Sequence, residues 1–366
     1  DGWGETIFEP VDLQEKIAFL KDWTRKLHAA GYTGLSWPKA YGGAGATLME
    51  QVIFNEDVAH FKAPTPYNGI ALGMVGPTLI EVGTEEQKQQ YLSKMLTCED
   101  IWCQGYSEPG SGSDLASLQT RATQDGDEFV INGQKVWTSY AHDAAFCFLL
   151  ARTDPDVPKH KGLSCFIVDM KSPGIDIRPL KQITGESEFN EVFFNNVRVP
   201  RENLVGELNN GWTVGIGLLM HERATTSILG QANLQALVRD VIDLARQQGH
   251  SKDPVIRQRL TRLYTESEAV KHYGYRSLTK RLRGLPPGPE GSAHRLALTR
   301  LTQQAQELAM QLQGPYAQLV HGSSHAIQDG VWQFGFLRSR SATIAGGTAE
   351  IQQNIIAERV LGLPKG

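Results

Sequence analysis

The sequence of 366 residues has no long apolar run, and this absence excludes a protein built on membrane-spanning helices. No stretch approaches the ~18 consecutive apolar residues that such a helix requires. The first residues, DGWGETIFEP, also lack the charged segment and following apolar segment of a signal peptide. We therefore expect a soluble protein without a membrane span.

Cysteine is scarce, and the few cysteines do not form a recognisable site. Cys98, Cys103, Cys147 and Cys165 lie in apolar or strand-like contexts without CxxC spacing, which argues against a disulfide framework or a zinc centre. The ten histidines include no HExxH motif, and we predict no metal site. A reducing compartment is the simplest interpretation. The ending GLPKG is not a peroxisomal signal, so we expect a bacterial cytoplasm or, alternatively, a mitochondrial matrix.

Blocks of one charge are also missing. The net charge is −4, and Lys and Arg are spread along the chain, so no electrostatic footprint for nucleic acid is present. An anionic ligand must therefore be bound locally. With 40% hydrophobic and 21% charged residues, the composition is that of a globular chain long enough for two or three packed layers.

The hydrophobic period changes twice along the chain. In residues 1–99 it is helical, with breaks at WPKAYGGAGA and FKAPTPYNG and a capping box of Thr84 and Gln87. Residues 100–208 contain five or six short strand-like runs, which favours a small β-barrel or sandwich. In residues 209–366 the helical period returns. The pattern predicts an α+β protein with helical terminal domains and a central β domain. The clearest strand-like runs are DEFVINGQKVWTS, AAFCFLLART, LSCFIVDM, IDIRPL and NEVFFNNVRVP.

Two segments at the start of the β region are suited to binding a polar aromatic cofactor. YSEPGSGSDLAS is rich in small residues and hydroxyls, so its backbone N–H groups can approach a ligand closely. Further on, Trp137 and Ser139 place an aromatic plane beside a hydroxyl, which suits a flavin ring system. Each segment alone also has a plain interpretation, a turn for the first and a core strand for the second.

Six ordered segments give these signals a common explanation, because together they resemble the acyl-CoA dehydrogenase family. The resemblance covers nearly the whole chain, and it implies a C-terminal four-helix bundle and an FAD that reaches into a neighbouring subunit. The segments are WTRKLHAAGYTGLSWPKAYGGAG, GPTLIEVGTEEQKQQYL, SEPGSGSDLAS, INGQKVWTS, FFNNVRVPRENLVGELNNGW and IAGGTAEIQQNIIAERVLGLP.

The resemblance also implies which residues bind FAD. Two positions depart from the family pattern. Pro315 replaces a second glycine, and the region around Gln248 lacks an arginine that would make a charge-assisted contact to the phosphates. The residues expected at the flavin are Gln104, Tyr106, Ser107, Gly112, Ser113, Trp137 and Ser139. Those expected at the adenine dinucleotide are Gln311, Gly314, Thr348 and Glu350.

The catalytic base is expected on a helix of the C-terminal region. In many relatives it is the Glu of a Tyr-Glu-Gly-Thr stretch, but here that stretch reads AGGT, and Gly346 has no carboxylate. Gly346 can still donate its backbone N–H to the thioester carbonyl. Other family members place the base on the long helix that opens the C-terminal domain, where this chain has Glu222. We therefore predict Glu222 as the base, with Arg223, Ser113 and Gly346 at the substrate. Without the resemblance, Glu222 and Arg223 would be two exposed helix residues.

The resemblance predicts removal of an α proton from an acyl-CoA and transfer of a β hydride to flavin N5. Electrons would then pass to an electron-transferring flavoprotein, and the enzyme would be a homodimer or homotetramer. Three alternatives stay open. The chain could be one subunit of a heterotetramer that acts on bulky sterol side-chain thioesters, a non-catalytic flavin-binding subunit, or an oxidase that uses oxygen directly. A base on the long helix favours a branched, long or polycyclic acyl group.

Overall fold

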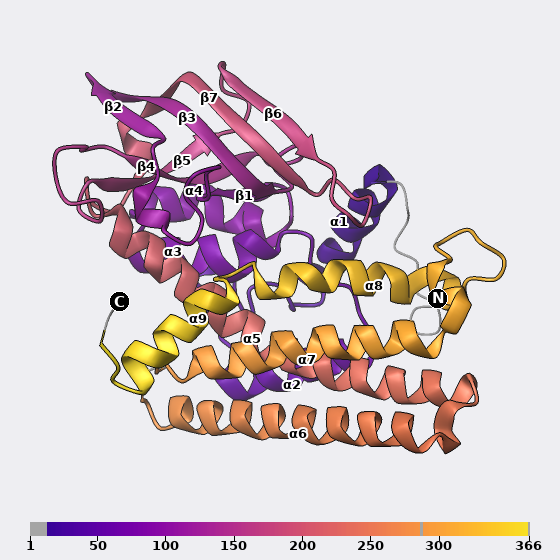
Figure 1. Cartoon of the computed structure of the whole chain (residues 1–366). Helices are drawn as coiled ribbons and strands as arrows, with labels where there is room; N and C mark the ends of the chain where they lie inside the picture. The colour runs from indigo at the N-terminus through magenta and orange to yellow at the C-terminus, as the bar shows by residue number, and fades with distance from the viewer. Residues whose placement is uncertain (1–12, 286–287, 365–366) are drawn as a thin grey trace. The chain divides into compact units, whose positions relative to one another are not determined.

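The structure is a computed structural model that describes residues 13–285 and 288–364, and for residues 222–228 it describes the backbone only. The described chain divides into two compact units. The sheet unit comprises residues 13–47 and 64–224, and the helical unit comprises residues 48–63 and 225–364. In chain order, helices come first, then strands, then helices again, which confirms the predicted α+β class (Figure 1).

The N-terminal helices contribute to both units. The predicted capping box is confirmed, because Thr84 Oγ1 accepts from Gln87 N and Thr84 N donates to Gln87 Oε1, each at 3.2 Å. The second helix belongs to the helical unit, where Glu56 accepts from Tyr275 Oη at 3.0 Å. The helices are α1 (Leu13–Ala29), α2 (Leu48–His60), the π-helix η2 (Ala71–Val75), α3 (Gly76–Val82) and α4 (Glu85–Leu96).

The strands form one sheet in the order β6-β7-β3-β2-β4-β5-β8, with β1 paired to β4 (Figure 1). The five predicted runs correspond to β3 to β7. Three further strands carry no clear pattern, because β1 and β8 are very short and β2 reads RATQD with one buried side chain. The strands are β1 (Trp102–Gly105), β2 (Arg121–Asp125), β3 (Glu128–Ser139), β4 (Phe146–Arg152), β5 (Leu163–Asp169), β6 (Ile175–Leu180), β7 (Phe189–Pro200) and β8 (Leu204–Val205).

Strands β4 and β5 are buried on both faces, which explains their continuous apolar sequences. Phe148 on β4 belongs to a core shared with the N-terminal helices. Its neighbour Leu149 belongs to a second core, which also contains Phe129 of β3 and Phe166 of β5. The rings of Phe129 and Phe166 lie 4.9 Å apart. The sheet therefore folds over this second core.

The helical unit has its own core, centred on α7 and including Leu234, Leu308 and Trp332. In Figure 1, α6 and α7 run side by side. No helix in the described part of the chain is long and apolar enough to cross a membrane. The helices are α5 (Gly211–Gln247), which begins in the sheet unit, α6 (Pro254–Leu282), α7 (Gly291–Leu312), α8 (Val331–Ser339) and α9 (Ala349–Ile355).

Candidate functional site

The two segments predicted to line the flavin lie against each other in the sheet unit. The first follows β1, and the second is the end of β3. Val136 N donates to Ser107 O at 2.9 Å, and Lys135 Nζ donates to Tyr106 O at 2.9 Å. Both bonds are formed immediately before Trp137. Folding therefore joins Tyr106 and Ser107 to the strand that carries Trp137 and Ser139.

Trp137 occupies a bulge that turns its indole outward. The pairing of β3 with β7 shifts register between Lys135 and Thr138, so Trp137 has no partner in the ladder. Its φ of 59° is unusual for a bulky residue, and its side chain is 58% exposed although its neighbour Thr138 is fully buried. Strained backbone of this kind is often found at ligand sites. Because of this bulge, the indole of Trp137 presents its aromatic face to solvent.

The Gly/Ser loop after β1 is closed by its own hydrogen bonds. Glu108 and Ser111 exchange two backbone hydrogen bonds of 3.0 Å, and Ser111 Oγ donates to Asp114 O at 2.7 Å. The tip residues Gly112 and Ser113 are exposed, and a Cβ placed on Gly112 would meet no atom within 4 Å. The loop base is thus fixed, while its tip has room for a ligand.

A buried ion pair lies beneath this loop. Lys135 is 0% exposed, and its Nζ lies 2.8 Å from Glu108 Oε1. Burial would raise the pKa of Glu108, but the nearby ammonium and the hydrogen bonds it accepts outweigh burial and lower this pKa. For Lys135, burial acts in the opposite direction and lowers the pKa of the ammonium. The Glu108 carboxylate raises this pKa, but by less than burial lowers it.

This ion pair was not predicted from the sequence. Its signal was present in β3, where the inward face reads Phe129, Ile131, Gly133 and Lys135, because a charged residue in an inward register requires a buried partner.

These residues fit the flavin part of FAD. An exposed indole, a glycine with open space above it and two exposed or half-buried hydroxyls, those of Ser113 and Ser139, suit a flat ring with polar edges. Gln104 is half-buried on β1, where it pairs in register with Phe148. Binding of FAD by these residues stays a prediction.

In the helical unit, Gln311 and Gly314 lie at the C-terminal end of α7. Gln311 is exposed, and its Oε1 accepts a hydrogen bond from Arg259 of α6. Gly314 has a φ of 55° and begins the short helix η6 (Gly314–Gln318). Pro315 lies in the first turn of η6, where the fixed φ of proline suits a helix. A proline therefore fits the backbone here, although it removes one N–H donor.

The AGGT stretch forms a left-handed turn before α9. Gly346 and Gly347 have φ values of 62° and 99°, a conformation that favours glycine. Thr348 caps α9 because its Oγ1 accepts from Ile351 N at 3.3 Å. Glu350 is exposed in the first turn of that helix. A carboxylate-bearing residue at position 346 would strain this turn, which is consistent with a base placed elsewhere.

The two groups predicted for the adenine dinucleotide lie near opposite ends of α7. Arg295, in the first turns of α7, donates to the carbonyl of Ala345, directly before Gly346. Gln311 lies 16 residues further along the helix, or about 24 Å at 1.5 Å per residue. Within one helical unit, therefore, the structure does not bring Gln311 and Gly314 together with Thr348 and Glu350.

The predicted base lies on α5. The side chains of Glu222 and Arg223 are outside the described residues, so their contacts stay open. The preceding residue, His221, is described, and its Nε2 lies 3.2 Å from Glu81 Oε2 on α3. Glu222 as base and Arg223 at the substrate both stay predictions.

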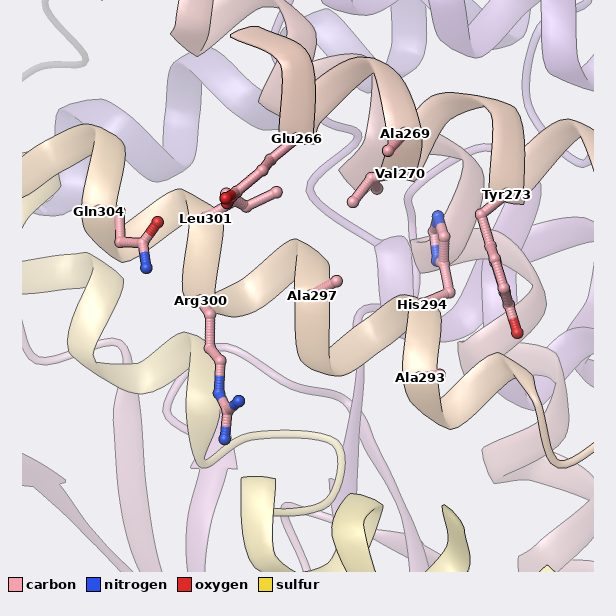
Figure 2. Close-up of a pocket in the computed structure, with 10 residues that line it drawn as sticks. All are labelled: Glu266, Ala269, Val270, Tyr273, Ala293, His294, Ala297, Arg300, Leu301 and Gln304. Atoms are coloured by element: carbon pink, nitrogen blue, oxygen red, sulfur yellow. The ribbon is translucent and has the colours of Figure 1, made fainter. Parts of the chain in front are cut away.

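A separate pocket of about 420 Å³ lies between α6 and α7 and contains none of the predicted site residues. Figure 2 shows Glu266 pointing from α6 toward α7 and His294 pointing from α7 toward α6, whereas Arg300 points away from α6. His294 is 5% exposed, and its ring stacks on Tyr273 with centroids 5.9 Å apart. The remaining lining is mainly alanine, valine and leucine.

His294 is expected to make the protein less stable to acid. Burial lowers its pKa in the folded chain below the value of about 6.5 in the unfolded chain. Below pH 6.5 the unfolded chain binds a proton that the folded chain does not, so this contribution to stability is present above that pH and is lost as the pH falls toward the folded pKa. In His294→Phe, the melting temperature should fall less than in wild type between pH 7 and pH 5. Parallel curves for the two proteins would contradict this.

One histidine pair has a spacing that could hold a metal on a helix. His321 and His325 lie four residues apart, but the chain there forms turns instead of a helix. His321 Nδ1 lies 2.6 Å from Asp329 Oδ2. Among the described side chains, no group of three or more His, Cys, Asp or Glu residues is arranged for a metal ion.

Comparison with known proteins agrees with this architecture. Three family models match the chain in order: the acyl-CoA dehydrogenase N-terminal domain over residues 5–99, the middle domain over residues 103–197 and the C-terminal domain over residues 209–361. These ranges include the loop after β1, the bulge in β3 and the AGGT turn.

Individual relatives match over the same extent. Acyl-CoA dehydrogenase IpdE1 of Mycobacterium tuberculosis is 41% identical, and the match covers 97% of this chain and 91% of that protein. A solved structure described as Tcur3481-Tcur3483 steroid ACAD has a TM-score of 0.88 and 34% identity, covering 95% of this chain and 89% of that one. The ChsE4-ChsE5 complex from Mycobacterium tuberculosis gives a TM-score of 0.85 and 32% identity, with coverage of 95% and 90%. Since identity of this level extends over nearly all of the chain, the protein belongs to the acyl-CoA dehydrogenase family of oxidoreductases.

Proposed function

We propose that the protein catalyses α,β-dehydrogenation of an acyl-CoA thioester to the trans-2-enoyl-CoA. The substrate loses a proton from its α carbon and a hydride from its β carbon, so it is oxidised by two electrons. FAD, when bound, supplies the hydride acceptor, and an electron-transferring flavoprotein would accept the electrons afterwards. Family membership supports the reaction class.

The observation that carries the proposal is the junction between the loop after β1 and the end of β3. The carbonyls of Tyr106 and Ser107 accept hydrogen bonds from Lys135 and Val136, and the exposed indole of Trp137 follows directly. This junction supplies the exposed aromatic face of Trp137 and, two residues further along β3, the hydroxyl of Ser139. A flavin ring needs both kinds of contact.

Two groups of the chain would act on the thioester. Glu222 would accept the α proton, since a carboxylate within hydrogen-bond reach of that carbon can serve as a general base. The backbone N–H of Gly346 would donate to the thioester oxygen as negative charge develops there. This donor does not depend on a side chain, and glycine suits the φ of 62° at that position. Arg223 would help hold polar groups of the substrate.

A second candidate is the same chemistry in a heteromeric enzyme. The predicted adenine-dinucleotide residues lie near opposite ends of α7, about 24 Å apart along the helix. A site that used both groups could take them from two chains, which a homo-oligomer supplies as well as a heteromer. Two solved relatives are named as pairs, Tcur3481-Tcur3483 and ChsE4-ChsE5, and the first is called a steroid ACAD. These names and the absence of the phosphate-binding arginine support a partner chain and a bulky, steroid-like acyl group.

The visible spectrum of the purified protein tests these proposals. The protein, alone and with candidate partner chains, is mixed anaerobically with short straight-chain, branched and steroid side-chain CoA thioesters. We expect the yellow flavin to bleach with a bulky thioester. FAD that is retained only with a partner would favour the heteromer. Bleaching by short straight chains alone would contradict the bulky substrate, and no bleaching in any mixture would leave a non-catalytic subunit. Hydrogen peroxide released in air would indicate an oxidase.

A further inference from the structure

We propose that Glu108 and Lys135 are positioning residues that hold the two flavin-lining segments in one fixed arrangement. The inference rests on the proposed function, because it assumes that these segments line FAD. Neither residue is placed against the cofactor. They act through the backbone of the loop after β1 and through the strand that leads to Trp137.

Lys135 connects the two segments. Its ammonium donates to Tyr106 O at 2.9 Å and to Glu108 Oε1 at 2.8 Å, and both of these residues follow β1. Lys135 itself lies on β3, two residues before Trp137, and is fully buried. Movement of the loop away from the bulge would leave a buried ammonium without partners, which is energetically costly. The ammonium thus couples the position of the loop to the position of the bulge.

Glu108 closes the loop on itself. Its Oε2 accepts from Gln119 N at 2.6 Å, and its Oε1 accepts from Thr120 N at 2.8 Å. Residue 108 lies near the start of the loop, and residues 119 and 120 lie at its end. One carboxylate therefore ties both ends, while the tip at Gly112 and Ser113 stays exposed. The two ends of the loop are therefore held rigidly, and its tip is left open to a ligand.

Arg152 strengthens the same arrangement from β4. It is 8% exposed, and its guanidinium donates to Ala116 O at 2.6 Å and to Leu118 O at 3.1 Å. Buried charges thus hold the loop at both ends.

Stability alone does not explain a buried ion pair at this place. Removing two charges from water costs free energy that their attraction only partly restores, and well-packed apolar side chains often stabilise a protein as well. This pair fixes geometry through several bonds at once, because its ammonium donates to Tyr106 O as well as to Glu108, and its carboxylate also accepts from two backbone N–H groups. A preorganised loop binds its ligand more tightly, since less conformational entropy is lost on binding.

The test compares Lys135→Met with the matched control Lys16→Met. Lys16 Nζ forms a similar pair with Glu186 at 2.7 Å, and its side chain is 11% exposed, but neither residue belongs to a predicted flavin segment. The first readout is hydrogen exchange of residues 106–118 in protein stripped of FAD. The second is the dissociation constant of FAD, together with the visible spectrum of the bound flavin.

In Lys135→Met, exchange of residues 106–118 should become at least about tenfold faster and the dissociation constant should rise by about tenfold or more. Lys16→Met should leave both at wild-type values. Wild-type exchange, affinity and flavin spectrum in Lys135→Met would overturn the inference. If wild type binds no FAD under any condition, the proposed function fails, and the exchange measurement alone then decides whether the pair holds the loop.

A double variant covers the case in which Lys135→Met does not fold. Glu108→Gln with Lys135→Met removes both charges and keeps one acceptor for the backbone N–H groups of Gln119 and Thr120. Such a replacement often preserves stability. With a wild-type circular dichroism spectrum, this protein should still show faster exchange of the loop and weaker FAD binding. Wild-type values of both would overturn the inference here as well.

Discussion

Glu222→Gln is expected to retain FAD and to lose bleaching by acyl-CoA, with a rate about 10²–10⁴-fold below wild type, the contribution typical of a general base. Glutamine has nearly the same shape as glutamate, so helix α5 and the binding of the thioester should be preserved. Its amide cannot accept the α proton. The measurement is the anaerobic rate of flavin bleaching in a stopped-flow experiment.

Glu81→Gln is the matched control for this experiment. Glu81 Oε2 lies 3.2 Å from His221, the residue before Glu222, and the Glu81 side chain is 58% exposed. Removing this carboxylate changes the charge beside His221 and leaves Glu222 itself unchanged. We expect bleaching close to the wild-type rate. If Glu222→Gln bleaches as fast as wild type, another carboxylate is the base.

Gly211→Ala is expected to destabilise the protein and to weaken catalysis. Gly211 is the first residue of α5, and a Cβ there would lie 2.4 to 2.6 Å from three backbone atoms of Ser164 on β5. These atoms belong to a strand and cannot yield as a side chain can, so the helix must move. Overpacking of this kind costs about 1–3 kcal/mol. Because the same helix carries Glu222, a shift of its start should also reduce the rate of bleaching.

Gly217→Ala, on the same helix, should have the opposite effect on stability. A Cβ at Gly217 would meet no atom within 4 Å, and alanine favours a helix over glycine by about 0.5–1 kcal/mol. We expect the melting temperature to fall in Gly211→Ala and to rise in Gly217→Ala, as measured by circular dichroism. A fall of equal size in both would mean that the contact with Ser164 is not the cause.

Part of the fold follows directly from local sequence. The capping box of Thr84 and Gln87 depends on residues three positions apart, so their order alone predicts it. Strands β3 to β7 are long or apolar enough to show a strand pattern. By contrast, Arg121 to Asp125 form β2 with a single buried side chain, and this strand exists because β3 pairs with it. Pairing between distant segments has no local sequence signal.

The candidate site divides in the same way. Resemblance to a family selects Trp137, Ser113 and Gly346 by their position in motifs, without any knowledge of geometry. It does not reveal that Trp137 adopts a φ of 59° in a bulge, because that conformation results from the register between β3 and β7. Nor does it reveal Glu108 beside Lys135, which are 27 residues apart and meet only when β1 and β3 come together.

The sequence by itself therefore determined the α+β class, the family and the residue types offered to a flavin and a thioester, since these depend on local pattern and on ordered motifs. Tertiary structure decided how those residues are held. It joined the loop after β1 to the bulge of β3 through a buried ion pair, placed the AGGT turn and Gly314 near opposite ends of α7, and packed Gly211 on the backbone of Ser164. The reason is physical: register, burial and close backbone approach arise between segments far apart in the chain, where no local propensity acts.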